Sequence, residues 1–140
     1  MPRILAALCF LSLIALPASA FDNQRIVNAG KVLRAAGFET MFESPTLGYV
    51  GTSGNLRIHQ FDDNLSVIAD QNGNLEDHKA ICAIVLAHLG GVDPSFAAPA
   101  VDRVFDAQFA GHRDVAKAGG AWITVVASND RFVECQIRAD

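Results

Sequence analysis

The segment that most constrains the fold of this 140-residue chain is an almost wholly apolar run from Ala80 to Leu89. Asn74 is a suitable N-cap residue before it, and Glu76 and Asp77 follow where acidic side chains favour the start of a helix. Gly90-Gly91 ends the pattern. A helix that is apolar on nearly every side needs cover from all directions. We therefore predict a helix at the centre of the core, with the rest of the chain packed around it.

Two further helices are expected, one on each side of this segment in the sequence. Asn23 to Ala36 carries apolar residues at helical spacing. Asp93-Pro94 has the pattern of a cap followed by proline at the first helical position, and the helix should end at Gly111. Pro99 leaves the first part of this helix uncertain. Its predicted inward stripe consists of Val101, Val104, Phe105 and Phe109.

Short segments with turn residues on either side predict five strands. They are Thr46–Val50, Leu56–Phe61, Leu65–Asp70, Trp122–Ala127 and Phe132–Arg138. Phe38–Pro45 is interpreted as a connection, residues 51–55 as a turn, and His112–Gly120 is left unassigned. Runs of strands separated from runs of helices favour an α+β fold. We expect a small antiparallel sheet, made of a three-stranded meander plus a C-terminal hairpin, packed against two or three helices.

The N-terminus has the pattern of a cleavable signal peptide, residues 1–20. Arg3 precedes an uncharged apolar run from Ile4 to Leu16, and Ala18-Ser19-Ala20 supplies the small residues of a cleavage site. The run is too short to span a bilayer stably. The expected mature chain starts at Phe21 and forms a single domain, residues 21–140. We expect this domain to be periplasmic or secreted.

The charge balance excludes two classes of partner. The formal net charge is −4, so the chain lacks the basic surface of a nucleic-acid-binding protein. It also lacks the Lys/Arg stripe of a helix that lies on a membrane surface. We expect no nucleic-acid partner and no membrane insertion after the signal is cleaved.

The cysteines predict a disulfide. Cys9 lies in the signal, which leaves Cys82 and Cys135 in an exported chain. The alternative is a pair of separate buried thiols. His78 lies four residues before Cys82 and shares its helix face, so a free Cys82 thiol could form a nucleophilic pair with it.

Few other residues have a pattern that suggests chemistry. His59, Asp62 and Asp63 lie at a strand end and turn, where they form either a metal or acid–base site or an ordinary solvated turn. Asp70–Glu76 resembles a calcium loop in composition, but its glycine is misplaced for an EF-hand. Gly51–Gly54 is one residue short of a nucleophile elbow and is interpreted as a hairpin loop.

The aromatic residues near the start of the mature chain are the remaining candidates for binding. Phe38, Phe42 and Tyr49 either line a groove or partner-binding surface, or pack in the core. The sequence does not separate these alternatives.

The sequence therefore favours a non-catalytic function. We expect an exported binding or inhibitor-like domain that takes a protein or a small apolar ligand in the cell envelope, with no cofactor and no metal. One alternative is a small secreted hydrolase that uses His59 with Asp62 or Asp63. Another is a structural subunit of an envelope assembly, which would need a large apolar face.

Overall fold

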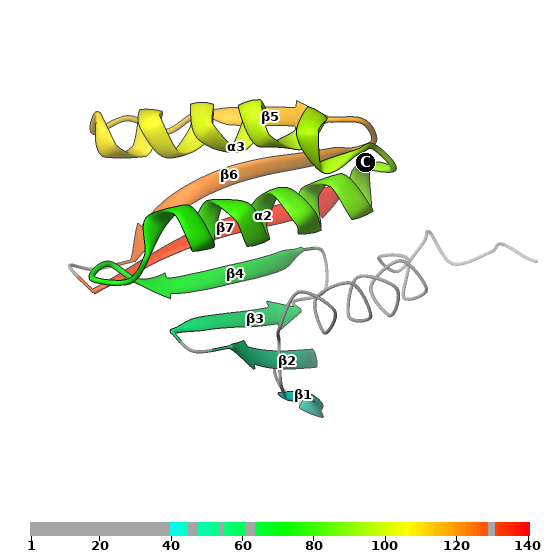
Figure 1. Ribbon diagram of the computed structural model, residues 1–140, viewed down its shortest axis with the longest axis vertical. Coiled ribbons are helices and arrows are strands. Elements are labelled where there is room, and N and C mark those ends of the chain that lie inside the picture. Colours follow the sequence, from blue (N-terminus) through cyan, green and yellow to red (C-terminus); the bar gives the residue numbers. More distant parts are fainter. Residues whose placement is uncertain (1–39, 45–47, 54, 61–63, 129–130) are drawn as a thin grey trace, which may run out of the picture.

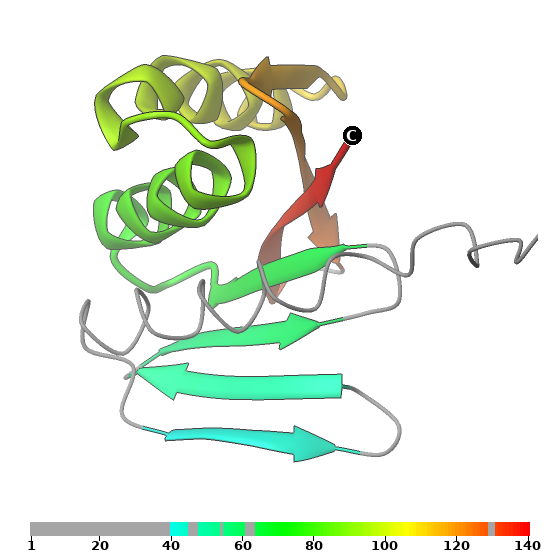
Figure 2. The same cartoon turned by 90° about the vertical axis from the view of Figure 1, so that its right-hand side faces the viewer.

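The fold is α+β, with an antiparallel sheet packed against two helices (Figures 1 and 2). The computed structural model describes residues 40–44, 48–53, 55–60, 64–128 and 131–140. The predicted signal peptide, the start at Phe21 and the helix Asn23–Ala36 lie outside the described residues. In chain order the elements are β1 (Thr40–Ser44), β2 (Gly48–Ser53), β3 (Leu56–Gln60), β4 (Leu65–Asp70), α2 (Leu75–Gly90), α3 (Pro94–Phe109), β5 (Val115–Ala118), β6 (Ala121–Ser128) and β7 (Phe132–Ala139).

The sheet has seven strands in the order β1-β2-β3-β4-β7-β6-β5, and all neighbours are antiparallel. The C-terminal strand β7 therefore lies between β4 and β6. Figure 1 shows α2 and α3 over the part of the sheet formed by β4 to β7, while β1, β2 and β3 extend beyond them. This arrangement confirms the predicted meander, hairpin and antiparallel sheet.

The local signals for the two helices act as predicted. Asn74 caps α2 by accepting hydrogen bonds from the backbone N–H of Glu76 (3.0 Å) and of Asp77 (3.3 Å). Asp93 caps α3 by accepting from the N–H of Ser95 at 2.9 Å. The helix continues through Pro99, which is exposed. A proline there removes one backbone hydrogen bond, and the burial of the apolar face that follows compensates for it.

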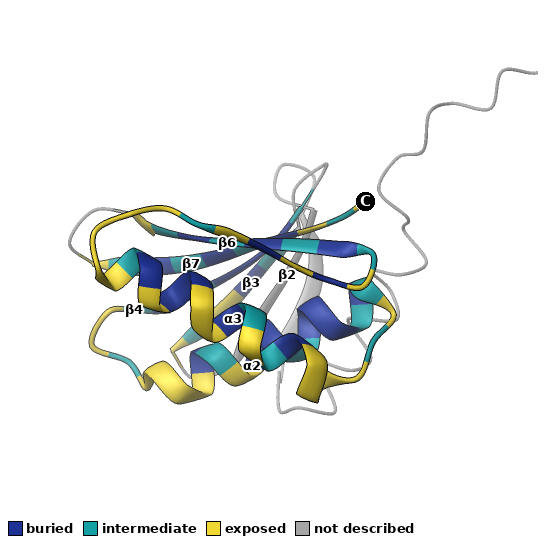
Figure 3. Cartoon of the chain, turned by 90° about the horizontal axis from the view of Figure 1, so that it is seen from above, coloured by how far each residue is buried: buried dark blue, intermediate teal, exposed yellow. Residues whose placement is uncertain are grey.

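The core lies between the helices and the sheet, and α2 is at its centre. Val85 and Leu86 are 1% and 0% exposed, and the strand residues that face them are equally buried (Figure 3). The predicted inward face of the last strand is confirmed, with Val133, Cys135 and Ile137 all buried. The inward stripe of α3 was predicted wrongly at its end. Phe109 is 58% exposed because it is the last residue of the helix, one turn beyond the buried Phe105.

Three segments of the sheet differ from the prediction. Thr40–Ser44 is strand β1 and not a connection, and Val115–Ala118 is strand β5 in the unassigned region. Strand β2 begins at Gly48 and runs through Ser53, so the predicted turn at residues 51–55 starts too early. These short segments have weak patterns of their own. Pairing with a neighbouring strand supplies their backbone hydrogen bonds.

Two glycine pairs bring the end of α2 against the β5–β6 turn. The backbone N–H of Gly120 donates to the carbonyl of Gly90 at 3.0 Å. A Cβ at Gly90 would lie 2.1 Å from the carbonyl oxygen of Ala118. A Cβ at Gly119, where φ is +58°, would lie 2.1 Å from the carbonyl oxygen of Gly90. The close backbone approach therefore accounts for Gly90 and Gly119, while Gly91 is the C-cap of α2 in the left-handed conformation, with φ of +68°.

Candidate functional site

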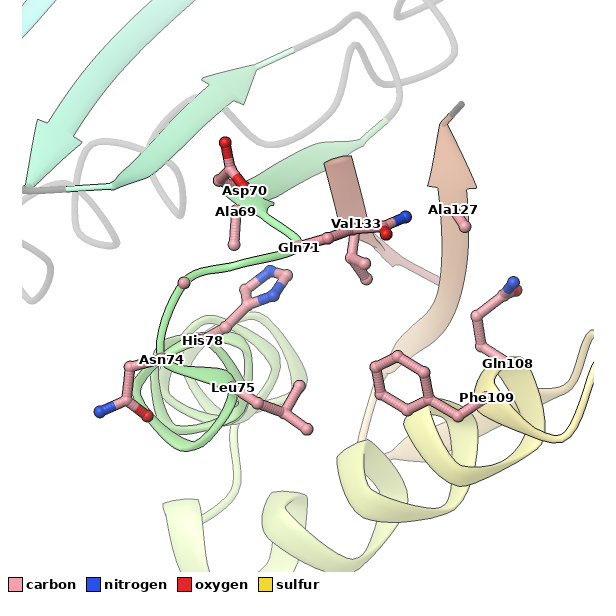
Figure 4. A pocket seen from close by; sticks show the side chains of 11 residues that line it. Ala69, Asp70, Gln71, Asn74, Leu75, His78, Gln108, Phe109, Ala127 and Val133 are labelled. Atoms are coloured by element: carbon pink, nitrogen blue, oxygen red, sulfur yellow. The ribbon is translucent and has the colours of Figure 1, made fainter. Parts of the chain in front are cut away.

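A cavity of about 390 Å³ lies at the end of the core where β4 leads into α2. Its walls come from the β4–α2 turn, the first turns of α2, the end of α3 and the adjoining ends of β6 and β7 (Figure 4). The lining residues are Ala69, Asp70, Gln71, Gly73, Asn74, Leu75, His78, Gln108, Phe109, Ala127 and Val133.

Exposed apolar side chains form the rim of this cavity. Leu75 is 37% exposed at the start of α2, and Phe109 is 58% exposed at the end of α3. Figure 4 shows the two side chains pointing toward one another from their separate helices. Ala69, Ala127 and Val133 supply apolar wall from the strands. An exposed leucine and phenylalanine at one opening are more informative than scattered surface apolar residues, because together they line a concave site.

Most of the polar groups in the β4–α2 turn maintain the local structure. Asp70 accepts a hydrogen bond from the backbone N–H of Asn72 at 2.9 Å, and Asn74 caps α2. This accounts for the calcium-like composition of Asp70–Glu76 as a turn followed by a helix cap. Gln108, which is half-buried near the end of α3, reaches the cavity from the other side.

His78 forms the inner side of the cavity and is 1% exposed. Its Nε2–H donates to the carbonyl of Val67 at 2.8 Å, and its ring meets that of Phe105 edge-on, with 5.1 Å between the centroids. Burial lowers the pKa of this imidazole, and the hydrogen bond to Val67 opposes the shift. The neutral ring is therefore favoured, with a proton on Nε2.

The predicted disulfide is present between Cys82 on α2 and Cys135 on β7, whose Cα atoms are 6.5 Å apart. Both residues are fully buried. One potential ligand atom each from His78, Cys82 and Cys135 lie within 4.8 Å of one another, a set that could hold a soft metal ion. Metal binding and nucleophilic attack both require a thiolate, and both sulfur atoms are in the disulfide. This arrangement does not support the interpretation of His78 and Cys82 as a nucleophilic pair.

The buried His78 predicts a pH dependence of stability. Its folded pKa lies below the usual value of 6.5, so between these two values the unfolded chain binds more protons. The free energy of unfolding should therefore fall as the pH falls through about 6.5, and should be constant well above it. Urea unfolding across this range measures the effect, and His78→Gln should reduce the slope.

A second histidine requires its own control. Burial, and then the charge of Arg57, lower the pKa of His59, while Glu134 opposes the shift. His59→Gln should thus remove a separate part of the pH dependence. A slope that is unchanged in His78→Gln would contradict the assignment to the buried imidazole.

The structure brings together few of the residues that the sequence singled out. His59 is half-buried in β3, while Asp62 and Asp63 lie outside the described residues. Phe38 also lies outside them. Phe42 is in β1, and Tyr49 is in β2. His59 does not line the cavity near His78.

His59 instead faces a polar cluster on the side of the sheet away from the helices. It pairs across the strands with Ser66, whose buried hydroxyl lies 2.6 Å from a carboxylate oxygen of Glu134. The hydroxyl therefore donates to a carboxylate. A serine nucleophile needs an imidazole that accepts the proton of its hydroxyl. In this cluster the hydroxyl of Ser66 donates to the carboxylate of Glu134 instead, so the groups are not arranged as a catalytic triad.

No sequence pattern predicted the cavity itself. Its residues come from separate segments, and Gln71, Gln108 and Phe109 have no motif in common. Helical periodicity placed Phe109 in the core, and only the structure shows that it is 58% exposed at the cavity.

Scans of this chain against protein-family models, curated proteins and solved structures find no match. Within the described part of the chain, no helix has both the length and the apolar character needed to cross a membrane.

Proposed function

We propose that this protein is an exported, non-catalytic binding domain and that the cavity beside His78 takes a small apolar ligand. The observation that carries the proposal is the exposure of Leu75 and Phe109 on opposite sides of one concave opening. When a ligand covers apolar side chains that are exposed around a cavity, their removal from water favours binding.

The size and chemistry of the cavity support a small molecule as the occupant. Ligand pockets have volumes of about 300–1,000 Å³ and combine apolar walls with a few polar groups. The volume here is about 390 Å³, the walls are mainly apolar, and the amide of Gln108 offers hydrogen bonds that can orient a ligand. A neutral imidazole at the inner side adds no charge for an apolar ligand to desolvate.

The disulfide supports a preformed cavity. It joins α2 to β7 one helical turn from His78 and two residues from Val133, both of which line the cavity. Walls held in place before binding reduce the ordering cost that a ligand must overcome. A disulfide is also typical of compartments outside the cytoplasm, which agrees with the signal pattern of residues 1–20.

The described surface favours this function over an envelope subunit. A structural subunit needs a large, contiguous apolar face. In the part of the chain that the structure describes, the exposed large apolar residues are Leu75, Phe96, Phe109 and Val115, and only Leu75 and Phe109 share the cavity. The hydrolase alternative rests on Asp62 and Asp63, which lie outside the described residues.

Binding of the neutral apolar dye Nile red tests the proposal. Phe109→Asp should weaken binding at least about tenfold, because a charge would replace the apolar rim. Phe96→Asp is the matched control, since Phe96 is on the same helix, is 76% exposed and does not line the cavity. Fluorescence titration measures both affinities. Equal loss of binding in the two variants, or saturable binding that Phe109→Asp leaves intact, would overturn the proposal.

A further inference from the structure

A second cavity, of about 360 Å³, lies on the face of the sheet opposite the helices. Strand register places its side chains. Trp122 pairs with Arg138 and Thr124 pairs with Gln136, so these four lie as a block across β6 and β7. The described residues that line it are Asn64, Arg113, Val115, Trp122, Ile123, Thr124, Gln136 and Arg138.

Arg113 lines this cavity from the segment between α3 and β5. Hydrogen bonds of the next residue, Asp114, join this segment to β6 and to α3. The hydroxyl of Thr124 donates to the carbonyl of Asp114 at 2.9 Å. The carboxylate of Asp114 receives two hydrogen bonds from Arg103 on α3, at 2.7 and 3.1 Å. Arg113, which directly precedes Asp114, is therefore held beside β6 by its neighbour's bonds.

Two described acidic residues near the cavity, Asp114 and Asp140, are paired with cations that do not line it. The hydrogen bonds from Arg103 lower the pKa of Asp114, which keeps this carboxylate ionised and paired. Asp140 forms an ion pair with Lys117 at 2.5 Å and accepts a hydrogen bond from Trp122 Nε1. Neither Arg103 nor Lys117 is among the lining residues.

Among the residues that the structure describes, the two arginines of the lining have no acidic partner. Neither Arg113 nor Arg138 forms an ion pair with a described residue. Glu134, four residues before Arg138 on the same face of β7, accepts hydrogen bonds from Ser66 at 2.6 Å and from Gln136 at 2.9 Å, and it does not line the cavity. The cavity therefore has two guanidinium groups that no described carboxylate pairs with, in a chain with a net charge of −4.

We propose that this second cavity is a binding site for a small organic or inorganic oxyanion, held by Arg113 and Arg138. A guanidinium group presents paired N–H donors that match the oxygens of a carboxylate or a phosphate. The side-chain amides of Asn64 and Gln136 line the same space and can add hydrogen bonds.

The chain has a built-in reporter for this site, because Trp122 is its only tryptophan. Fluorescence titration with inorganic phosphate and with citrate should give a saturable change. Sodium chloride at matched ionic strength should not. The stronger of the two responses distinguishes a phosphate site from a carboxylate site. If neither anion gives a saturable change beyond that of chloride, the proposal is overturned.

Charge-matched variants locate the binding. Arg113→Gln and Arg138→Gln should each weaken the preferred anion at least about tenfold, because each removes a charge-assisted contact. Arg131→Gln removes the same charge from an exposed residue outside the cavity and should retain the parent affinity. Equal weakening by all three variants would show that the effect depends on net charge alone, and it would overturn the proposed site. Phe109→Asp should leave anion binding unchanged, so this test and that of the apolar cavity can fail independently.

Discussion

Removing the bond between Cys82 and Cys135 is expected to lower the free energy of unfolding by about 4 kcal/mol. The bond joins residues 53 positions apart in the sequence. In the chain-entropy model, its main effect is to restrict the unfolded chain, and a longer closed loop gives a larger effect. A small domain has a net stability of about 5–15 kcal/mol, so the reduced chain should be marginally folded.

Urea unfolding of oxidised and reduced protein measures this difference. The double variant Cys82→Ala, Cys135→Ala is the control, because its stability should be the same with and without reductant. Both sulfur atoms are in the disulfide, so the oxidised chain without residues 1–20, and hence without Cys9, should show no free thiol even after denaturation. Two titratable thiols in protein purified without reductant would show that the bond is absent, and equal unfolding midpoints for the oxidised and reduced chains would show that it does not stabilise the domain.

Val85→Asp is expected to unfold the domain or destabilise it by several kcal/mol. Val85 is 1% exposed in the middle of α2, inside the core cluster that the helices and the sheet share. A carboxylate there either remains charged without a partner or takes up a proton, and both outcomes cost free energy. The loss is comparable to the whole stability of a small domain.

Ala80→Asp is the matched control for this prediction, because Ala80 is on the same helix and exposed. It should melt close to the parent protein, apart from a small effect of helix propensity. Thermal unfolding followed by circular dichroism compares the two variants. If Val85→Asp and Ala80→Asp melt together, α2 is not central to the core.

The local elements were predictable because their signals lie within a few residues of sequence. Asn74 and Asp93 cap their helices as the sequence indicates, and the backbone bonds that they accept come from residues two or three positions later. The strands β4, β6 and β7 have strong apolar patterns and were found near their true bounds. Strands β1 and β5 were missed because their pairing partners, and not their own composition, stabilise them.

The candidate sites were largely not predictable, because they combine residues from distant segments. The apolar cavity needs Leu75 from the start of α2 and Phe109 from the end of α3, which meet only when the helices pack together. The periodicity of α3 placed Phe109 inside, since a pattern cannot show where the neighbouring sheet ends. Arg113 and Arg138 are likewise 25 positions apart and converge through the register of β5, β6 and β7.

The sequence by itself determined the class of fold, the central place of α2 and the pairing of Cys82 with Cys135. Each of these follows from hydrophobic patterning, capping residues or the count of cysteines. Only the tertiary structure decided the seven-stranded order, the burial of His78 against the disulfide, and which exposed side chains share a cavity. The physical reason is that burial and charge compensation depend on neighbours in space, and short-range sequence patterns do not specify those neighbours.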